Sequence, residues 1–383
     1  MSEAPPSSSY GVPSKSSLED LKPVRPPSEL SEANKGQASR RWPLCCGCLV
    51  ALLVLLSLGL GWLWVAAHPS HAGNGARVLS VEPEELEDDN YISLSLRYRE
   101  GKLQSISSLG HLWEEDAQGV LRPAFGLTEP GVYFWPISVQ GEWAGLPAGE
   151  QLYARNLSTG ELDSIALGDT EKVMLSTTAT RGSLLATASE IDGNVRVFRI
   201  KEGQQLWSSA VWPSNTVCMT FVGEALAVGT DRGKVELLKA QTGEGIRSLE
   251  TGHRRVTALA ASVDGELLLV GCILGQKGKA KAGGEVQLWD LTTSAASPSA
   301  TFVIDNVFDE VSALAISPDG AYLAAGRTKG GLQVWDRSGA LIGSFLHDDS
   351  LLFPKREVLA IAFDTDRVAW AAGVQVFERK LGQ

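Results

Sequence analysis

Histidine and cysteine, the side chains that most often bind metals, are scarce in this sequence. The 383 residues include five histidines and five cysteines. The histidines are scattered along the chain, and three of the cysteines, Cys45, Cys46 and Cys48, form one tight group without a second pair. Because a zinc site draws on two such groups, this pattern predicts no bound metal, and we expect no cofactor.

A basic excess and catalytic motifs are lacking as well. Lysine and arginine together number 34 against 45 aspartates and glutamates, which gives a net charge of −11. A protein that binds nucleic acid carries a basic patch, so this balance argues against nucleic acid as a partner. The chain also has neither a nucleophile elbow nor a phosphate-binding loop. We therefore expect a protein that is not an enzyme.

The first 67 residues differ in composition from the rest of the chain. Residues 1–41 are rich in proline, serine, glutamate and lysine, and Tyr10 is their single aromatic residue, which predicts a disordered tail. Residues 44–67 carry no charge and exceed the ~20 helical residues that a bilayer core requires. Together with the flanking Trp42, they predict a single transmembrane helix over residues 42–67.

A cleaved signal peptide is the alternative interpretation of this apolar run. The segment Ser70-His71-Ala72 resembles a cleavage site. However, the run is longer than the ~7–15 apolar residues of a signal peptide, and a tail of about 40 residues precedes it. We therefore favour an uncleaved signal-anchor, followed by a short linker over residues 68–76.

The charges on the two sides of the span predict its orientation. A basic cluster that includes Arg40 and Arg41 precedes it, and an acidic run rich in glutamate follows it. The positive-inside rule then places the tail in the cytosol and the large C-terminal region on the non-cytosolic side of the membrane. Cys45, Cys46 and Cys48 lie at the cytosolic end, where they are either lipidation sites or small apolar residues of the helix.

Three stretches of sixteen residues align with one another without gaps. They are VTALAASVDGELLLVG from Val256, VSALAISPDGAYLAAG from Val311 and VLAIAFDTDRVAWAAG from Val358. In each, an alternating apolar run leads to a polar turn and a second apolar run, which predicts two antiparallel strands joined by a hairpin. A third-strand phrase such as LQVWD, residues 332–336, follows each stretch.

The third-strand phrase recurs seven times along the chain. We take these residues as its equivalent positions: Trp113, Arg155, Phe198, Leu238, Trp289, Trp335 and Phe377. Their spacing of 40 to 51 residues is typical of β-propellers, in which each blade has four strands. The longest spacing contains an insertion at residues 275–284. We therefore predict an all-β fold, a seven-bladed β-propeller over residues 77–383, rather than an open array or two sandwiches.

The last of the seven units lacks a fourth strand. The chain reaches Gln383 just after the third strand of this unit, and residues 77–83 precede the first complete unit without belonging to it. We predict that residues 77–83 pair with the strand at 374–380. This pairing closes the ring and removes two exposed sheet edges, which otherwise favour aggregation.

Several short motifs resemble the WD-repeat β-propeller family. They are the Trp-Asp pairs at 289–290 and 335–336, Gly252-His253, the turn SPDG at 317–320 and the phrase LSTGE at 157–161. In that family a His, a Ser or Thr, a turn Asp and the Trp of one blade form a hydrogen-bonded set, and no blade of this chain carries all four. The phrase GQQLW at 203–207 instead resembles the repeats of quinone-type propellers.

The resemblance implies a non-enzymatic platform that binds another protein through its loops. A quinone-type propeller enzyme or cofactor binder, and a component of envelope assembly or sensing, are the alternatives. Because the linker is short, the closing strand begins near the bilayer, so we expect the partner at the face away from the membrane. This face collects the least regular loops, and such loops often carry function. Its candidate residues are Lys277, Lys279, Lys281, Asp305, Asp309, Leu351, Leu352 and Phe353.

Two more features concern covalent modification of the propeller. Cys218 and Cys272 fall in predicted strands of neighbouring blades, where they either form a disulfide or act as small buried apolar residues. Asn156 begins the single glycosylation sequon of the chain. We expect this sequon to be accessible because it lies at a turn between a third and a fourth strand.

Overall fold

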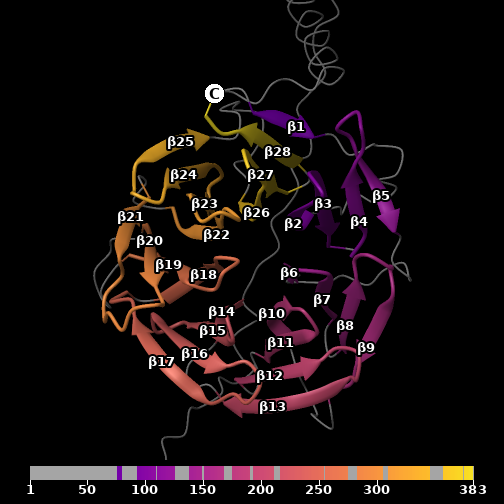
Figure 1. The fold of residues 1–383 in the computed structure, drawn as a ribbon, viewed down its shortest axis with the longest axis vertical. Helices are drawn as coiled ribbons and strands as arrows, with labels where there is room; N and C mark the ends of the chain where they lie inside the picture. The colour runs from indigo at the N-terminus through magenta and orange to yellow at the C-terminus, as the bar shows by residue number, and fades with distance from the viewer. Residues whose placement is uncertain are drawn as a thin grey trace, which may run out of the picture. The chain divides into compact units, whose positions relative to one another are not determined.

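A computed structural model shows that the described part of the chain is a ring of β-sheets. The described residues are 76–79, 93–125, 138–148, 151–167, 175–189, 193–210, 216–274, 283–304, 309–345 and 357–382, except for residues 109, 254 and 374. They form 28 strands in seven antiparallel sheets of four, arranged around a central axis (Figure 1). The predicted seven-bladed β-propeller is confirmed.

The predicted tail (1–41) and transmembrane helix (42–67) lie outside the described residues, as does the linker up to residue 75. Within the part of the chain that the structure describes, no helix has the length and apolar character that crossing a membrane requires.

Blades 1–4 take the first half of the ring, and each consists of four consecutive strands. Blade 1 contains β2 (Ser93–Arg99), β3 (Lys102–Ser107), β4 (Leu112–Glu115) and β5 (Leu121–Phe125). Blade 2 contains β6 (Ser138–Gln140), β7 (Trp143–Ala148), β8 (Gln151–Asn156) and β9 (Leu162–Ile165). Blade 3 contains β10 (Leu175–Arg181), β11 (Leu184–Ser189), β12 (Asn194–Arg199) and β13 (Gln204–Ala210). Blade 4 contains β14 (Thr216–Val222), β15 (Ala225–Thr230), β16 (Lys234–Lys239) and β17 (Gly245–Glu250).

Blades 5–7 complete the ring. Blade 5 contains β18 (Arg255–Ala261), β19 (Leu267–Ile273), β20 (Gly284–Asp290) and β21 (Ala300–Val303). Blade 6 contains β22 (Val311–Ile316), β23 (Tyr322–Arg327), β24 (Leu332–Asp336) and β25 (Leu341–Phe345). Blade 7 contains β26 (Val358–Phe363), β27 (Arg367–Ala372), β28 (Gln375–Lys380) and β1 (Arg77–Leu79).

The third strands carry the equivalent positions that the sequence repeat predicts. All seven of these residues lie in the third strand of their blade. In four blades, the register between the third and fourth strands shifts immediately before this residue, at Trp113, Phe198, Leu238 and Trp335. A bulge at a constant place shows that the positions are structurally equivalent.

The gapless alignment of the three sixteen-residue stretches is wrong in its second half for blade 7. In blade 5, Gly271 pairs with Ala258, whereas in blade 7 it is Ala371 that pairs with Ala360. The hairpin of blade 7 is shorter, so Gly373 follows the strand β27 and is not the counterpart of Gly271. Because the turn of blade 7 is shorter, its second strand begins earlier in the sequence than the alignment assumes. The pairing between the first and second strands is nevertheless the same in both blades.

Glycine in the second strand allows neighbouring blades to approach closely. A Cβ atom added to Gly271 would lie 2.7 Å from Cγ1 of Val311, the first residue of β22 in the next blade. Gly229 has the same relation to Val256 of blade 5, also at 2.7 Å. Real Cβ atoms are not found this close to a neighbour, so the packing of blade 4 on blade 5 and of blade 5 on blade 6 requires glycine at these two residues, whereas blades 3 and 7 have Ala188 and Ala371 at the equivalent place.

The strand β1 is the outermost strand of blade 7. It pairs antiparallel with β28, and Arg77 lies opposite Glu378, Val78 opposite Phe377 and Leu79 opposite Val376. Leu79 is buried between this blade and blade 1, within an apolar cluster that also contains residues of β2 and β26. Residues 80–83 of the predicted closing segment lie outside the described residues.

Candidate functional site

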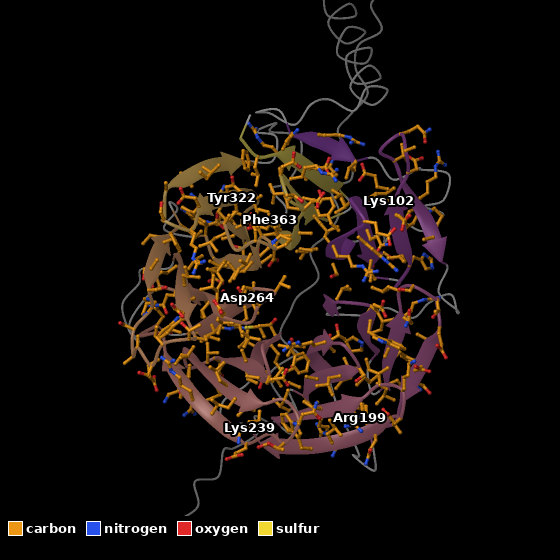
Figure 2. The ribbon with its side chains drawn as sticks, viewed as in Figure 1. Lys102, Arg199, Lys239, Asp264, Tyr322 and Phe363 are labelled. Carbon is orange, nitrogen blue, oxygen red and sulfur yellow. The ribbon has the colours of Figure 1, made fainter. Side chains whose placement is uncertain are left out.

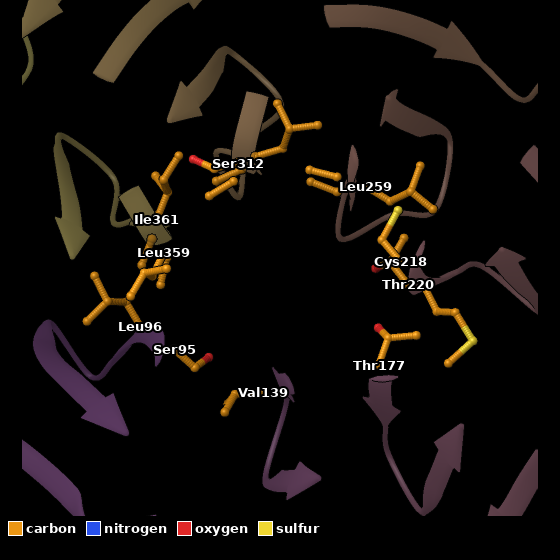
Figure 3. A pocket seen from close by; sticks show the side chains of 18 of the residues that line it. Ser95, Leu96, Val139, Thr177, Cys218, Thr220, Leu259, Ser312, Leu359 and Ile361 are labelled. Carbon is orange, nitrogen blue, oxygen red and sulfur yellow. The ribbon is translucent and has the colours of Figure 1, made fainter. Parts of the chain in front are cut away.

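The first strands of all seven blades surround a cavity of about 750 Å³ on the ring axis. Its lining residues come from β2, β6, β10, β14, β18, β22 and β26 (Figure 3). A volume between ~300 and 1,000 Å³ is typical of small-molecule sites. The channel is therefore the candidate binding site that the fold itself creates.

The strand register places residues of different blades at common levels along this channel. At the level of Ser95, blades 3 and 4 contribute Thr177 and Cys218. At the same level, blades 5–7 contribute only alanines: Ala258, Ala313 and Ala360. At this level, blades 1, 3 and 4 therefore carry hydroxyl and thiol groups where blades 5–7 carry methyl groups. Blades 5 and 6 add the hydroxyl groups of Thr257 and Ser312 at a neighbouring level.

A belt of larger apolar side chains lies one residue further along each first strand. It consists of Leu96, Met219, Leu259, Leu314 and Ile361, all of which line the cavity. Figure 3 shows Ile361 and Leu359 on the opposite side of the cavity from Thr177 and Thr220. Several of these apolar side chains are buried between the blades, and most of the surface that the channel exposes is polar.

Arg97 brings a positive charge to the next level of the channel. Its Nε atom donates a hydrogen bond to Oε1 of Gln104 at 2.6 Å, and Nη1 donates to the carbonyl oxygen of Gly141 in blade 2. The Nη2 atom is buried without a hydrogen-bond partner. Burial, aided by the nearby Arg99 and opposed by the carboxylates of Glu142 and Glu114, lowers the pKa of Arg97 to about 10, so the group stays cationic at neutral pH.

Glu357 and Arg255 line the mouth of the channel at which the first strands begin. Burial, together with repulsion from Glu310, raises the pKa of Glu357 above its usual range. This mouth therefore carries both signs of charge, whereas Arg97 lies further along its strand. Among the described residues, no group of three or more His, Cys, Asp or Glu side chains could hold a metal ion.

The candidate residues of the distal face are mostly outside the described residues. This holds for Lys277, Lys279 and Lys281, for Asp305, and for the segment 351–353. Asp309 is described, and it does not fit a contact surface because its side chain is only 1% exposed.

Asp309 instead organises the turn between β23 and β24. Its Oδ1 atom accepts hydrogen bonds from Oγ1 of Thr328 at 3.0 Å and from the backbone N–H of Lys329 at 2.9 Å. Arg327 lies 3.6 Å from the other carboxylate oxygen. The charge that we predicted to contact a partner is used inside blade 6.

Asn156 is not the accessible glycosylation residue that the sequon predicts. It is only 8% exposed, and its Oδ1 atom accepts hydrogen bonds from the backbone N–H groups of Ser158 and Thr159, at 2.9 and 3.0 Å. Asn156 occupies the position after the equivalent residue Arg155, where blade 5 has Asp290, whose carboxylate caps the same turn. Asn156 is therefore less accessible than we expected, and its glycosylation stays a prediction.

Cys218 and Cys272 are free thiols in blades 4 and 5. Both pack in the apolar cluster between these blades. Burial raises the pKa of Cys272 to about 12 and that of Cys218 well above its usual range. Cys272 therefore matches the second of the two expectations, a small buried apolar residue, whereas Cys218 is partly buried and also lines the channel. The group Cys45, Cys46 and Cys48 lies outside the described residues.

Blade 5 links its histidine to its tryptophan through two residues that sequence reasoning missed. Nε2 of His253 lies 2.6 Å from Oε1 of Glu285, and Nε2 of Gln287 donates to the same oxygen at 2.8 Å. Nε1 of Trp289 in turn donates to Oε1 of Gln287 at 3.2 Å. Alternate residues of a strand share one face, so Glu285, Gln287 and Trp289 lie on the same face of β20. This spacing, together with Gly252-His253, is the sequence pattern that could have predicted the hydrogen bonds.

A second polar cluster that sequence reasoning missed joins blade 7 to blade 1. Oε1 of Glu378 accepts hydrogen bonds from the hydroxyl of Tyr98 at 2.7 Å and from Arg367 at 3.0 Å. Arg77 lies between the two blades, 3.7 Å from Glu378 and 3.4 Å from Glu115. Burial and the adjacent Glu378 carboxylate raise the pKa of Tyr98 far above its usual range. These groups are paired with one another, so we read them as a structural seam.

Comparisons with known proteins identify the repeats. A family profile described as "Anaphase-promoting complex subunit 4 WD40 domain" matches residues 179–264, and one described as "WD domain, G-beta repeat" matches residues 301–336. A solved structure, described as "Crystal structure of the computationally designed Ika8 protein: crystal packing No.1 in P63", is 19% identical. The alignment covers 79% of this chain and 100% of that one, with a TM-score of 0.55. The chain has no significant match among curated proteins. It therefore contains WD40 repeats within an all-β, seven-bladed β-propeller.

Proposed function

We propose that this protein is a membrane-anchored, non-enzymatic platform that binds another protein through the loops of its propeller. The observation that carries this proposal is the combination of WD40 repeat segments with a closed ring of seven blades. Such a ring is rigid because each blade packs against two others, and loops on a rigid scaffold are well suited to recognition.

The proposed contact surface lies on the face where the blades are linked. In an antiparallel four-strand blade, the turns between second and third strands and the links between blades emerge on one face. The segment between β19 and β20, which contains Lys277, Lys279 and Lys281, is such a turn. The segment between β25 and β26, which contains Phe353, is such a link. We propose that these two segments, with their basic and apolar residues, form the contact surface.

Co-purification tests this surface. A variant with Lys277, Lys279 and Lys281 changed to Glu and Phe353 changed to Ala should lose its partner while its melting temperature stays unchanged. The matched control changes three exposed lysines at turns of the opposite face to Glu: Lys102, Lys201 and Lys239. Retained binding in the first variant, or equal loss in the control, would exclude the linked face as the contact surface.

The membrane anchor is proposed from the uncharged run at residues 44–67, and its orientation from Arg40 and Arg41. In sealed right-side-out vesicles, added protease should reach the propeller and leave the tail intact. Digestion of the propeller only after lysis would reverse the orientation. Release of the protein from membranes by alkaline carbonate would contradict a transmembrane anchor.

Ring closure by residues 77–83 is a further part of the proposal. The pairing of β1 with β28 and the ion pairs of Arg77 support it. Deletion of residues 77–83 should expose the edges of β28 and of blade 1 and give aggregated protein. Soluble, monomeric protein after the deletion, as judged by size-exclusion chromatography, would show that the segment is dispensable.

A further inference from the structure

Five large apolar side chains are exposed in the described part of the chain, and all of them belong to blades 4–6. Val263 is 78% exposed in the turn between β18 and β19. Ile246 is the second residue of β17, Leu341 and Ile342 begin β25, and Val303 ends β21. Single exposed apolar residues are common on soluble proteins, whereas their gathering on three neighbouring blades calls for an explanation.

Four of these five side chains lie toward one face of the ring. The turns between first and second strands and those between third and fourth strands emerge on this face, which is opposite the linked face. Val263 lies in a turn of the first kind, and Ile246, Leu341 and Ile342 follow turns of the second kind. Val303 lies at the other end of its strand, toward the linked face. The exposed apolar side chains are therefore concentrated on one face.

A long uncharged segment connects the outer parts of these blades. Residues 291–303 include no charged side chain, and most of them are exposed. The segment borders blade 4, because Nη1 of Arg247 donates a hydrogen bond to the carbonyl oxygen of Thr293 at 2.8 Å. The strand that ends it borders blade 6, where a Cβ atom added to Gly339 would lie 3.3 Å from the ring of Phe302. The apolar side chains thus share one continuous surface.

Charged groups lie beside the apolar ones. Figure 2 shows Asp264, the residue after Val263, over blade 5 and Lys239 at the outer rim of blade 4. On this face, the turns of blades 4–6 contain five acidic residues and one basic residue, Arg337. The headgroup layer of a membrane accommodates apolar and charged groups side by side. Because anionic lipid would repel the acidic turns, the surface suits zwitterionic lipid.

The chain enters the propeller from this same face. The strand β1 is the fourth strand of blade 7 and runs antiparallel to β28, so it starts where the third-to-fourth turns emerge. Nine residues, 68–76, separate β1 from the apolar run at 44–67, and they span at most ~30 Å. The inference that follows rests on the proposed membrane anchor, which with this tether keeps the face near the bilayer. A short tether gives an effective concentration of roughly millimolar, so a few apolar side chains are enough for docking.

We propose that this face of blades 4–6 contacts the bilayer surface, with zwitterionic lipid around Val263, Ile246, Leu341 and Ile342. The hot spots of a protein contact are packed together near its centre. These four side chains instead extend from a turn of the inner strands to the outer strands of the neighbouring blades, as contact with a flat lipid surface requires. The linked face then points away from the membrane and is accessible to a protein partner.

Site-specific photocrosslinking of the full-length protein in phosphatidylcholine vesicles tests this contact. The photoreactive amino acid p-benzoylphenylalanine replaces Val263. In the matched control it replaces Val303, which belongs to the same blade and is also exposed but lies toward the linked face. After irradiation, mass spectrometry should find lipid attached at position 263 and none at position 303. Equal attachment at both positions, or attachment of a second copy or of another protein at position 263, would overturn the proposal.

A second set of variants tests whether the apolar side chains hold the face on the lipid. The combined changes Ile246→Ser, Leu341→Ser and Ile342→Ser should lower lipid attachment at position 263 by about fivefold or more, because they remove apolar surface from the contact. Val303→Ser should leave it unchanged. All of these side chains are exposed, so the melting temperatures in detergent should stay those of the wild type. Undiminished attachment in the triple variant would contradict the role of the apolar side chains.

Extraction with alkaline carbonate separates this inference from the anchor on which it rests. Protein that resists extraction but gains no lipid at position 263 would overturn the contact and leave the anchor intact. Protein that carbonate releases from the vesicles would overturn the anchor and the contact together.

Discussion

Blades 5–7 and blades 1–4 share one plan of strands but build their inner walls from different residues. In blades 5–7, the first strands place alanine at alternate positions, as in Ala258 and Ala260. In blades 1, 3 and 4, the same levels carry Ser95, Thr177 and Thr220. Both sets support the same pairing, so the difference teaches that the repeat constrains the contacts between blades more than the side chains at the axis.

The third strands differ in the same way. Blades 5 and 6 carry Trp289 and Trp335 at the equivalent position, whereas blades 2 and 4 carry Arg155 and Leu238. Trp289 is 1% exposed and fills the seam between blades 4 and 5. Blades 1 and 3 also carry buried aromatic residues at this position, Trp113 and Phe198, so the contrast in size is between blades 2 and 4 and the other blades.

The largest expected effect concerns these aromatic residues. Trp289→Ala should lower the free energy of unfolding by about 3–5 kcal/mol, because it removes a fully buried ring and leaves a cavity. It also leaves the side chain of Gln287 without a donor. Chemical denaturation measures the change. The equivalent Leu238→Ala in blade 4 should cost less, about 2–3 kcal/mol, and an equal or larger cost would contradict the comparison.

Glycine at the seam between blades is the next test. Gly271→Ala should destabilise by about 1–3 kcal/mol, because the new methyl group meets Val311. Gly245 is the matched control, since an added Cβ there has no atom within 4 Å. Gly245→Ala should be neutral or slightly stabilising in the same thermal unfolding assay. A neutral Gly271→Ala would show that the blades separate easily.

Arg77 joins the N-terminal and C-terminal halves of the ring. Arg77→Met should lower stability by about 1–2 kcal/mol, because Glu115 loses its cation while its side chain stays only 9% exposed. Glu378 keeps Arg367 and Tyr98 as partners. Urea denaturation should show a much smaller effect for Lys234→Met, whose ion pair with Glu250 is exposed. Equal midpoints for both variants would contradict a closing role for Arg77.

The smallest expected effect is a pH dependence of the hairpins in blades 5 and 6. The hydroxyl groups of Ser262 and Ser317 donate to Asp264 and Asp319, which holds the pKa of each aspartate below its usual range. A lowered pKa contributes stability above the unfolded pKa of ~3.9, and this contribution is lost as the pH falls through the folded value. Hydrogen exchange of these hairpins should therefore accelerate below about pH 4.

Asp319→Asn provides the comparison for this pH effect. The amide cannot titrate, so exchange in the hairpin of blade 6 should become insensitive to pH after correction for intrinsic rates. The hairpin of blade 3 turns at Gly182 and has no such serine–aspartate pair. Its corrected exchange rates should not differ between pH 3 and pH 5 in either protein. Parallel acceleration in blades 3 and 6 would indicate global unfolding instead.

The fold was largely predictable because its signals are local. The alternation of apolar residues, the polar turns and the recurring third-strand phrase each occupy a few neighbouring residues, and the period converts them into a blade count. The misaligned half of the blade 7 stretch has a local cause too. A gapless comparison aligns Gly373 with Gly271, although the shorter turn of blade 7 makes Ala371 the structural counterpart of Gly271.

The candidate sites were less predictable because burial depends on residues far apart in the sequence. In the sequence, Asn156 and Asp309 both look like exposed polar residues of loops. In the structure, both side chains are buried and accept hydrogen bonds from the turns of their own blades. The hydrogen bonds that connect His253 to Trp289 pass through Glu285 and Gln287. The resemblance had instead led us to look for a Ser or Thr and a turn Asp. Hydrogen-bond partners that come from other strands leave no mark in a local pattern.

By itself, the sequence determined the class of fold, the number of repeats and the place of each third strand, since strand periodicity and turn chemistry act over short distances. Only the tertiary structure decided what the seven inner strands present to the axis. Thr177 lies 80 residues after Arg97, and Ile361 lies 184 residues after Thr177. The three residues line one cavity only because the blades form a ring. The chemistry of the channel is therefore a property of the closed ring, and no single repeat contains it.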